Sequence, residues 1–202
     1  MIDNRSLVGT TLLASPHFST NKLFKESVIY IFMHSKNNIC GVVVNQQIGT
    51  IDNVSLDTLL KNTKNDKTHC KLLFQSSKSQ NSKKIPILLG GLSNSEYFTV
   101  LSLSRKKSSE NSNEFISLYL NMQEFIEDYY SANLISTFLI IKGITIWDEA
   151  QLVHEINNNF WFVTKPSINN IFHSELQNQW ITSIEELGVK DRKFLTLRNG
   201  NA

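Results

Sequence analysis

Cysteine is scarce in this chain, since its 202 residues include only Cys40 and Cys70. Two thiols exclude a disulfide framework and a zinc ribbon. Long hydrophobic runs are also lacking. The longest, Val28–Met33, has six residues, whereas a membrane-spanning helix needs about 20. The N-terminal residues show no signal-peptide pattern. We therefore expect a cytoplasmic protein that has reduced thiols and no contact with a membrane.

A strong charge of one sign is absent as well, because 20 Lys and Arg face 18 Asp and Glu, for a formal net charge of +2. A domain that binds nucleic acid electrostatically is usually far more basic, so direct DNA binding is not favoured. The hydrophobic fraction of 41% and the charged fraction of 19% are those of an ordinary globular protein. The length suits one domain with a core large enough to fold without disulfides.

Runs of β-branched and aromatic residues predict strands at residues 12–15, 25–35, 40–46, 85–89, 97–103, 137–147 and 160–164. Lys36-Asn37-Asn38 is a turn signal, so the second and third of these should form a β-hairpin. A break or bulge is expected at Gly143. Because strands and helices alternate irregularly, the pattern favours an α+β fold with a mixed sheet over a doubly wound parallel sheet.

Apolar residues at helical spacing predict four helices. Ser55 can cap a short helix, and Asn121 opens a capping-box pattern before a clear apolar stripe. Asp148 can cap a third helix, and the last one ends at Gly188. Two polar stretches, near residues 61–84 and 104–113, are expected to be loops. Gly90-Gly91 follows a strand without any phosphate-loop motif, so a tight turn is expected there.

Cys40 and His34 are the first pair to test for catalysis, because a thiol beside an imidazole can be a nucleophile. A hairpin loop of two or four residues would pair Ser35 with Cys40 and would point the thiol and the imidazole to opposite faces. Only a three-residue loop, Lys36 to Asn38, would pair His34 with Cys40. A cysteine in a strand more usually packs in the core as a small hydrophobic residue.

The pair His154-Glu155 begins the zinc motif H-E-x-x-H, but Asn158 stands where the second histidine should be. The other histidines lack ligand spacing, so no metal site and no cofactor is expected. The face that carries these residues, together with Gln151, is either an ordinary solvated surface or the edge of a ligand site. Basic residues at 83–84, at 105–107 and in the tail could bind a phosphate backbone if they met on one surface.

The order of several short motifs resembles that of the bacterial AlgH/YqgE family over residues 9–189. The resemblance rests on Gly9 to Pro16, Phe24 to Tyr30, His34, Gly41 to Asn45, Pro86 to Gly91, Gly143, Trp147, Gln151-Leu152, Glu155-Ile156, Asn159, Trp161, Trp180 and Leu187-Gly188. The chain departs from the family pattern at Met33, Ser35, Cys40, Leu92, Val153 and Gln179. The family does not require a thiol at position 40, and this weakens a Cys40 nucleophile.

The resemblance implies an α+β domain with a mixed, branched sheet that includes a small closed barrel and is surrounded by helices. We expect this single domain over residues 1–189 and a basic tail over residues 190–202. The resemblance implies no established activity. The name of one branch suggests transcriptional regulation, but the helix that begins at Asn121 is followed by a strand and not by a recognition helix.

The leading hypothesis is therefore a non-enzymatic binding protein, or an indirect regulator of gene expression, that takes an unknown protein partner or small ligand. No catalytic residue is assigned. The candidate ligand-binding residues, all near the ends of predicted elements, are His34, Asn45, Gln151, Glu155 and Asn159. The alternatives are a hydrolase that uses Cys40 with His34, and direct nucleic-acid binding through the basic loops.

Overall fold

The computed structural model describes residues 6–16, 24–52, 56, 84–106, 113–131 and 135–188. The chain divides into two compact units, and the second is inserted in the sequence of the first. Unit 1 consists of Met1–Asn45 and Ile146–Ala202, and unit 2 of Gln46–Thr145. The expected domain boundaries at 1–189 stay a prediction. Most of the helix expected from Ser55, residues 61–83 and 107–112 of the polar loops, and the basic tail lie outside the described residues.

Unit 1 contains four antiparallel strands in the order β3-β2-β1-β9. They are β1 (Thr11–Ala14), β2 (Val28–His34), β3 (Asn38–Val43) and β9 (Trp161–Thr164). The expected hairpin is confirmed as β2–β3, but its turn is the two-residue pair Lys36-Asn37, because the Ser35 N–H donates to the Asn38 carbonyl at 2.9 Å. The strongly apolar β2 and β3 are mostly buried, as strands covered on both faces should be.

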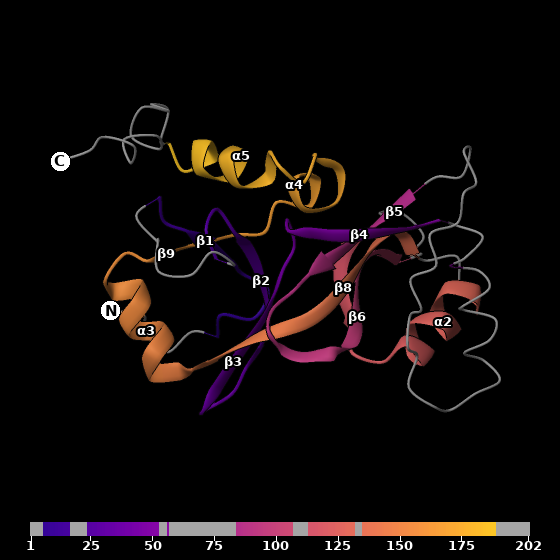
Figure 1. Ribbon diagram of the computed structural model, residues 1–202, viewed down its shortest axis with the longest axis horizontal. Helices are drawn as coiled ribbons and strands as arrows, with labels where there is room; N and C mark the ends of the chain where they lie inside the picture. Colours follow the sequence, from indigo (N-terminus) through magenta and orange to yellow (C-terminus); the bar gives the residue numbers. More distant parts are fainter. Residues whose placement is uncertain are drawn as a thin grey trace. The chain divides into compact units, whose positions relative to one another are not determined.

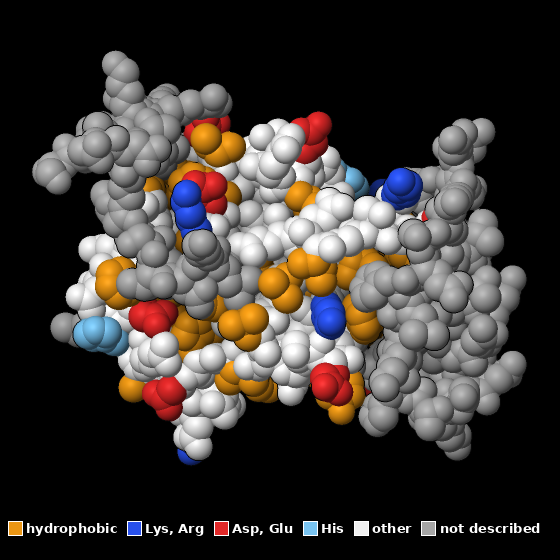
Figure 2. Space-filling model, in the orientation of Figure 1, with side chains coloured by type: hydrophobic (Ala, Val, Ile, Leu, Met, Phe, Trp, Pro, Cys, Tyr) orange, Lys and Arg blue, Asp and Glu red, His pale blue; other side chains and the backbone are white. Residues whose placement is uncertain are grey.

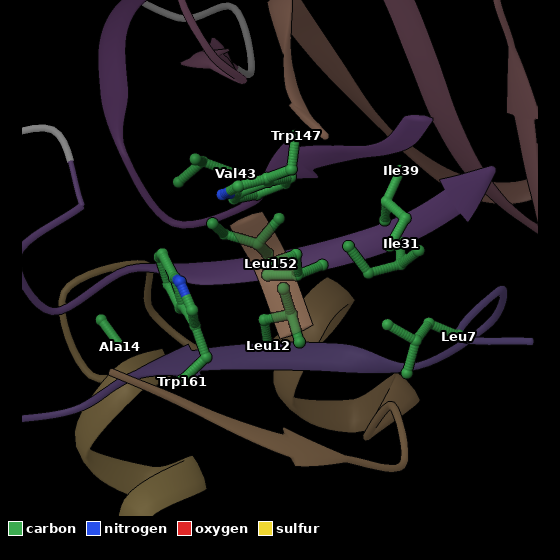
Figure 3. Close-up of a cluster of buried hydrophobic side chains, with 10 residues drawn as sticks. Leu7, Leu12, Ala14, Ile31, Ile39, Val43, Trp147, Leu152 and Trp161 are labelled. Carbon is green, nitrogen blue, oxygen red and sulfur yellow. The ribbon is translucent and has the colours of Figure 1, made fainter. Parts of the chain in front are cut away.

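The helices of unit 1 are α3 (Glu149–Asn157), α4 (Ile168–His173) and α5 (Gln179–Glu186). Leu12 and Ala14 of β1 belong to a core that includes Leu152 of α3, and Figure 3 shows these side chains converging with Trp147 and Trp161. The α4–α5 pair lies on the other side of β1 and β9 (Figure 1). Trp180 of α5 ties it there, since its indole N–H donates to the Ala14 carbonyl at 2.8 Å.

Unit 2 has the strand order β4-β5-β8-β6-β7, in which β5 and β8 are parallel and the other neighbours antiparallel. The strands are β4 (Gln47–Asp52), β5 (Lys84–Leu89), β6 (Ser93–Lys106), β7 (Asn113–Tyr119) and β8 (Ile135–Asp148). The last three residues of β8 belong to unit 1. The helix α2 (Met122–Ser131) packs on this sheet through Phe125 and Ile126. This mixture of pairings confirms the expected mixed sheet.

The chain bends closely around three glycines of unit 2. Gly143 has a φ of +73°, which a side chain disfavours. The pairing of β6 with β8 shifts from Phe98–Lys142 to Ser93–Ile144 beside it, so the expected irregularity at Gly143 is confirmed. A Cβ on Gly90 would overlap the Gly143 carbonyl, and one on Gly91 would overlap the Ile144 carbonyl. These glycines therefore allow backbone to pass against backbone.

The strands of the described residues belong to one mixed sheet, and β6 and β7 lie off its main path, which is the expected branching. The expected closed barrel is wrong. Closure requires hydrogen bonds between the first and last strands of a sheet. Within the described residues, the main path is instead open at β4 and β9. The loop expected over 104–113 is also corrected at both ends, because Arg105 of β6 pairs with Glu114 of β7 at 2.9 Å.

Candidate binding surface around α3

The N-terminal end of α3 is fixed by three contacts within unit 1. Asp148 caps the helix as predicted, because its Oδ1 accepts from the Ala150 N–H at 2.9 Å and from the Gln151 N–H at 3.4 Å. The Glu149 N–H donates to the Asn37 carbonyl in the β2–β3 turn at 3.3 Å. The Glu149 carboxylate also contacts His34, which lies at the end of β2.

His34 connects this helix end to the N-terminal segment. Its Nδ1 accepts from the Leu7 N–H at 3.1 Å, and its Nε2 lies 3.2 Å from Glu149 Oε1. An acceptor Nδ1 requires the proton to be on Nε2, which then donates to the carboxylate. The imidazole side chain is only 16% exposed. His34 thus acts here as a link between chain segments.

Glu155 is held from two directions at the C-terminal half of α3. Gln151 Nε2, one helical turn earlier, donates to Oε1 at 2.8 Å, and the Trp161 indole N–H donates to Oε2 at 2.7 Å. Gln151 and Glu155 therefore share one helix face, as the sequence predicts, and they are hydrogen-bonded across one turn. The bond to Trp161 fixes the carboxylate to β9.

Trp161 also belongs to an aromatic cluster beneath this end of α3. Its ring centroid lies 5.9 Å from that of Trp147 and 5.6 Å from that of Phe24, both edge to face. Trp147 and Trp161 are both buried, which is the usual place of large aromatic side chains that also find a hydrogen-bond partner. Phe24 also belongs to this cluster, which the sequence pattern did not predict. Its signal was its place at the start of the run Phe24 to Tyr30, which the resemblance had already singled out.

Asn159 ends α3. Its φ is +57°, its N–H donates to the Ile156 carbonyl at 3.0 Å, and the next N–H, from Phe160, donates to the Glu155 carbonyl at 2.9 Å. This pair of bonds is the Schellman arrangement, in which asparagine can take the left-handed position. The observed contacts of Asn159 are therefore those of a helix terminator.

Asn45 makes its contacts elsewhere in unit 1. Its Oδ1 accepts from the Val28 N–H at 2.9 Å, and its Nδ2 donates to the Glu26 carbonyl at 2.8 Å. Glu26 has a φ of +55°, an uncommon value for a glutamate. Asn45 thus holds the strained turn at the start of β2, whereas His34 lies at the opposite end of that strand.

Four of the five candidate residues therefore lie on α3 or at its two ends, whereas Asn45 does not. Gln151, Glu155 and Asn159 belong to α3 and its C-terminal turn, and His34 reaches the helix through Glu149. The exposed side of α3 consists of Ala150, Gln151, His154, Asn157 and Asn158. We call these five residues the α3 surface.

The sequence segment that contains α3 is acidic. Residues 143–164 contain Asp148, Glu149 and Glu155 but neither lysine nor arginine. On the face drawn in Figure 2, charged side chains of both signs are scattered among hydrophobic ones, and no extended basic area is visible among the described residues. The basic tail, which the nucleic-acid alternative needs, lies outside the described residues.

The Cys40–His34 pair that was considered for catalysis is not formed. With the turn at Lys36-Asn37, Met33 pairs with Cys40 and His34 pairs with Ile39. This register differs from both expected ones, which paired Cys40 with Ser35 or with His34. Because successive residues of a strand point to opposite faces, the thiol and the imidazole lie on different sides of the sheet. Cys40 is 3% exposed, and burial raises the pKa of its thiol.

Cys40 is therefore expected to alkylate more slowly than a model thiol. The thiolate is the reactive form, so burial and the raised pKa both lower the rate near neutral pH, and the rate should rise only above the ordinary pH range for a cysteine. The measurement is the rate of iodoacetamide labelling of a Cys70→Ser variant between pH 7 and pH 9. The same variant in denaturant is the control. Native-state labelling as fast as that of the denatured chain would contradict the structure.

Among the described residues, no group of three or more His, Cys, Asp or Glu side chains could hold a metal ion. No helix among these residues has both the length and the hydrophobicity needed to cross a membrane.

Comparisons with known proteins agree with the resemblance. The model of the AlgH-like family matches residues 11–192. A protein named "UPF0301 protein" from Buchnera aphidicola is 27% identical over 192 residues, 95% of each chain, and a similarly named protein from Rickettsia africae is 28% identical over 199 residues, 98% of this chain and 96% of the relative.

Two solved structures share the fold. The solution structure of the AlgH protein from Pseudomonas aeruginosa is 22% identical, with a TM-score of 0.62 and coverage of 100% of this chain and 99% of that one. The crystal structure of a protein from Corynebacterium diphtheriae is 17% identical, with a TM-score of 0.64 and coverage of 100% and 95%. Since the family model spans most of the sequence, this chain belongs to the AlgH-like family.

Proposed function

We propose that this protein is a non-enzymatic, cytoplasmic binding protein that holds a protein partner on the α3 surface and regulates gene expression indirectly through that partner. The observation that carries the proposal is the attachment of α3 at both ends. Asp148, Asn37 and His34 hold its first turn, and Trp161 holds Glu155 near its last turn.

This attachment matters because an isolated helix of nine residues is marginal in water. Contacts at both ends keep α3 formed and fix the direction of its exposed side chains. A surface that is ordered before association loses less conformational entropy when a partner binds. The α3 surface is thus suited to recognition by hydrogen bonds from Gln151, His154 and Asn158.

The charge of the region indicates the chemistry of the partner. Residues 143–164 contain three carboxylates and neither lysine nor arginine, so a partner with basic side chains would be electrostatically complementary to this segment. The same charge would repel a phosphate backbone, which supports a protein partner at this surface over a nucleic acid.

The test is a pair of charge variants studied in cells of the protein's own source. Ala150→Lys combined with Asn157→Lys places two positive charges on the α3 surface. Asn169→Lys combined with Gln177→Lys adds the same charge at exposed positions in the α4–α5 segment. All four side chains are exposed, so each pair should leave the unfolding free energy within about 1 kcal/mol of the parent.

We expect affinity purification with mass spectrometry to recover a stoichiometric partner with the parent and with the control pair, and to lose it with the α3 pair. Nuclease treatment should not change the recovery. A partner retained by both variants would contradict the α3 surface, and one released by nuclease would support the nucleic-acid alternative.

A further inference from the structure

One imidazole ties the N-terminal segment of unit 1 to the end of β2. Residues 6–10 run beside this strand, where the Gly9 N–H donates to the Ile31 carbonyl at 2.8 Å. Two residues earlier, the Leu7 N–H donates to Nδ1 of His34 at 3.1 Å. The Leu7 side chain is 6% exposed and lies among the core side chains drawn in Figure 3. The bond to His34 therefore fixes the main chain at the point where Leu7 enters the core.

This bond sets the charge of the imidazole. A main-chain N–H can only donate, so Nδ1 must carry no proton while the bond to Leu7 exists. The proton of neutral His34 is then on Nε2, which donates to Glu149 Oε1 at 3.2 Å. A second proton would have to occupy Nδ1, where it would face the Leu7 N–H with no acceptor between them. Protonated His34 can therefore keep its bond to Glu149 but not its bond to Leu7.

The elements that meet at His34 carry three charged side chains. They are Asp148 and Glu149 at the start of α3 and Lys36 in the β2–β3 turn, whereas residues 6–10 and β3 carry none. Lys36 is exposed, and the Asp148 carboxylate accepts from the first N–H groups of α3. Glu149 lies within ion-pair distance of the imidazole. Protonation turns this contact into an ion pair, so it is kept while the bond to Leu7 is lost.

We propose that His34 is a pH-operated latch for the N-terminal segment. The neutral imidazole holds both Leu7 and Glu149. The protonated imidazole holds Glu149 alone, so the Leu7 N–H is released to water and the segment opens locally. Histidine ordinarily changes charge between pH 8 and pH 5, which is the range in which the latch is tested. The latch is a property of the isolated chain and does not depend on the partner proposed for the α3 surface.

The experiment follows single amides by NMR on the full isotope-labelled chain. Exchange of the Leu7 amide with water is measured from pH 8 to pH 5 and expressed as a protection factor, which removes the intrinsic pH dependence of exchange. We expect the Leu7 protection to fall about tenfold, the size expected for one lost hydrogen bond. Its midpoint should match the titration of the His34 imidazole nitrogens. The Gly9 amide is the matched control, because its acceptor is the Ile31 carbonyl, and its protection should stay constant.

Two variants test whether His34 is the cause. His34→Gln offers an oxygen acceptor and an N–H donor but does not titrate, so the pH dependence at Leu7 should disappear. His173→Gln removes an exposed histidine of α4 and should leave that dependence unchanged.

The latch would be overturned by a Leu7 protection that stays constant while His34 titrates, by an equal fall at Gly9, or by a response that persists in His34→Gln. If that variant does not fold, the parent chain decides. Imidazole nitrogen shifts that place the proton of neutral His34 on Nδ1 would also overturn the latch, because Nδ1 could not then accept from Leu7.

Discussion

Gly91→Ala should prevent stable folding of unit 2. The added Cβ would overlap the carbonyl of Ile144 and lie 2.5 Å from the Thr145 nitrogen. These are backbone atoms of β8, so no side chain can move aside to make room. Core overpacking usually costs about 1–3 kcal/mol, and a clash with backbone should cost at least the upper value. The measurement is urea unfolding followed by circular dichroism.

Gly9→Ala is the matched control for this substitution. Gly9 has a φ of +79°, but nothing lies within 4 Å of the position its Cβ would take. It should therefore show only the conformational cost of a left-handed alanine, about 1–2 kcal/mol. Equal losses of stability for the two variants would mean that backbone crowding at Gly91 is not the cause.

Trp161→Ala should destabilise unit 1 by about 3–5 kcal/mol, the usual loss for a buried tryptophan. The side chain is 1% exposed and packs against Trp147 and Phe24. Its indole N–H is also a donor to Glu155. Denaturant unfolding followed by circular dichroism measures the change without relying on tryptophan fluorescence.

Two further variants separate the contributions at this position. Trp161→Phe keeps an aromatic ring but removes the bond to Glu155, so its loss should be intermediate. Val163→Ala, on the same strand but 39% exposed, should cost about 0.5 kcal/mol. A loss of that size for Trp161→Ala would show that the aromatic cluster contributes little to the stability of unit 1.

The elements that the sequence predicts well are those whose signals are local. Residues 122–130 have an uninterrupted apolar stripe at helical spacing, and Asp148 has the side chain that a helix N-terminus requires. The β2–β3 hairpin carries two apolar strands around a polar turn. In each case, the residues that determine the element are neighbours in the chain, so their pattern is enough.

Other elements depend on contacts that no local pattern reports. The ends of β6 and β7 look like a polar loop, yet they are strands because Arg105 and Glu114 face each other across the pair. The short α4 was not predicted because its six residues make too short a pattern, although Ile168, Ile171 and Phe172 have helical spacing. The barrel came from the resemblance and not from the residues, and no pattern in the chain could have tested it.

The candidate residues likewise include some whose contacts follow from local spacing and others whose contacts depend on distant parts of the chain. Gln151 and Glu155 are four residues apart, so helical geometry alone placed them together. The link from His34 to Glu149 spans 115 positions in the sequence, and it became visible only when β2 and α3 were placed. The sequence also does not predict the bond from Asn45 to the Glu26 carbonyl, because the two residues are 19 positions apart.

The insertion of unit 2 within unit 1 has a consequence for biosynthesis. On the ribosome, β1 emerges early, but its partner β9 and the whole of α3 follow only after all of unit 2 has been made. Pairings between such distant residues close late and slowly. Part of the apolar surface of the β2–β3 hairpin therefore stays uncovered until α3 and β9 are available, although the strands of unit 2 have been synthesised by then. Chaperone contact during translation should accordingly concentrate on residues 28–43, and it should end only after β9 has emerged from the ribosome and can pair with β1.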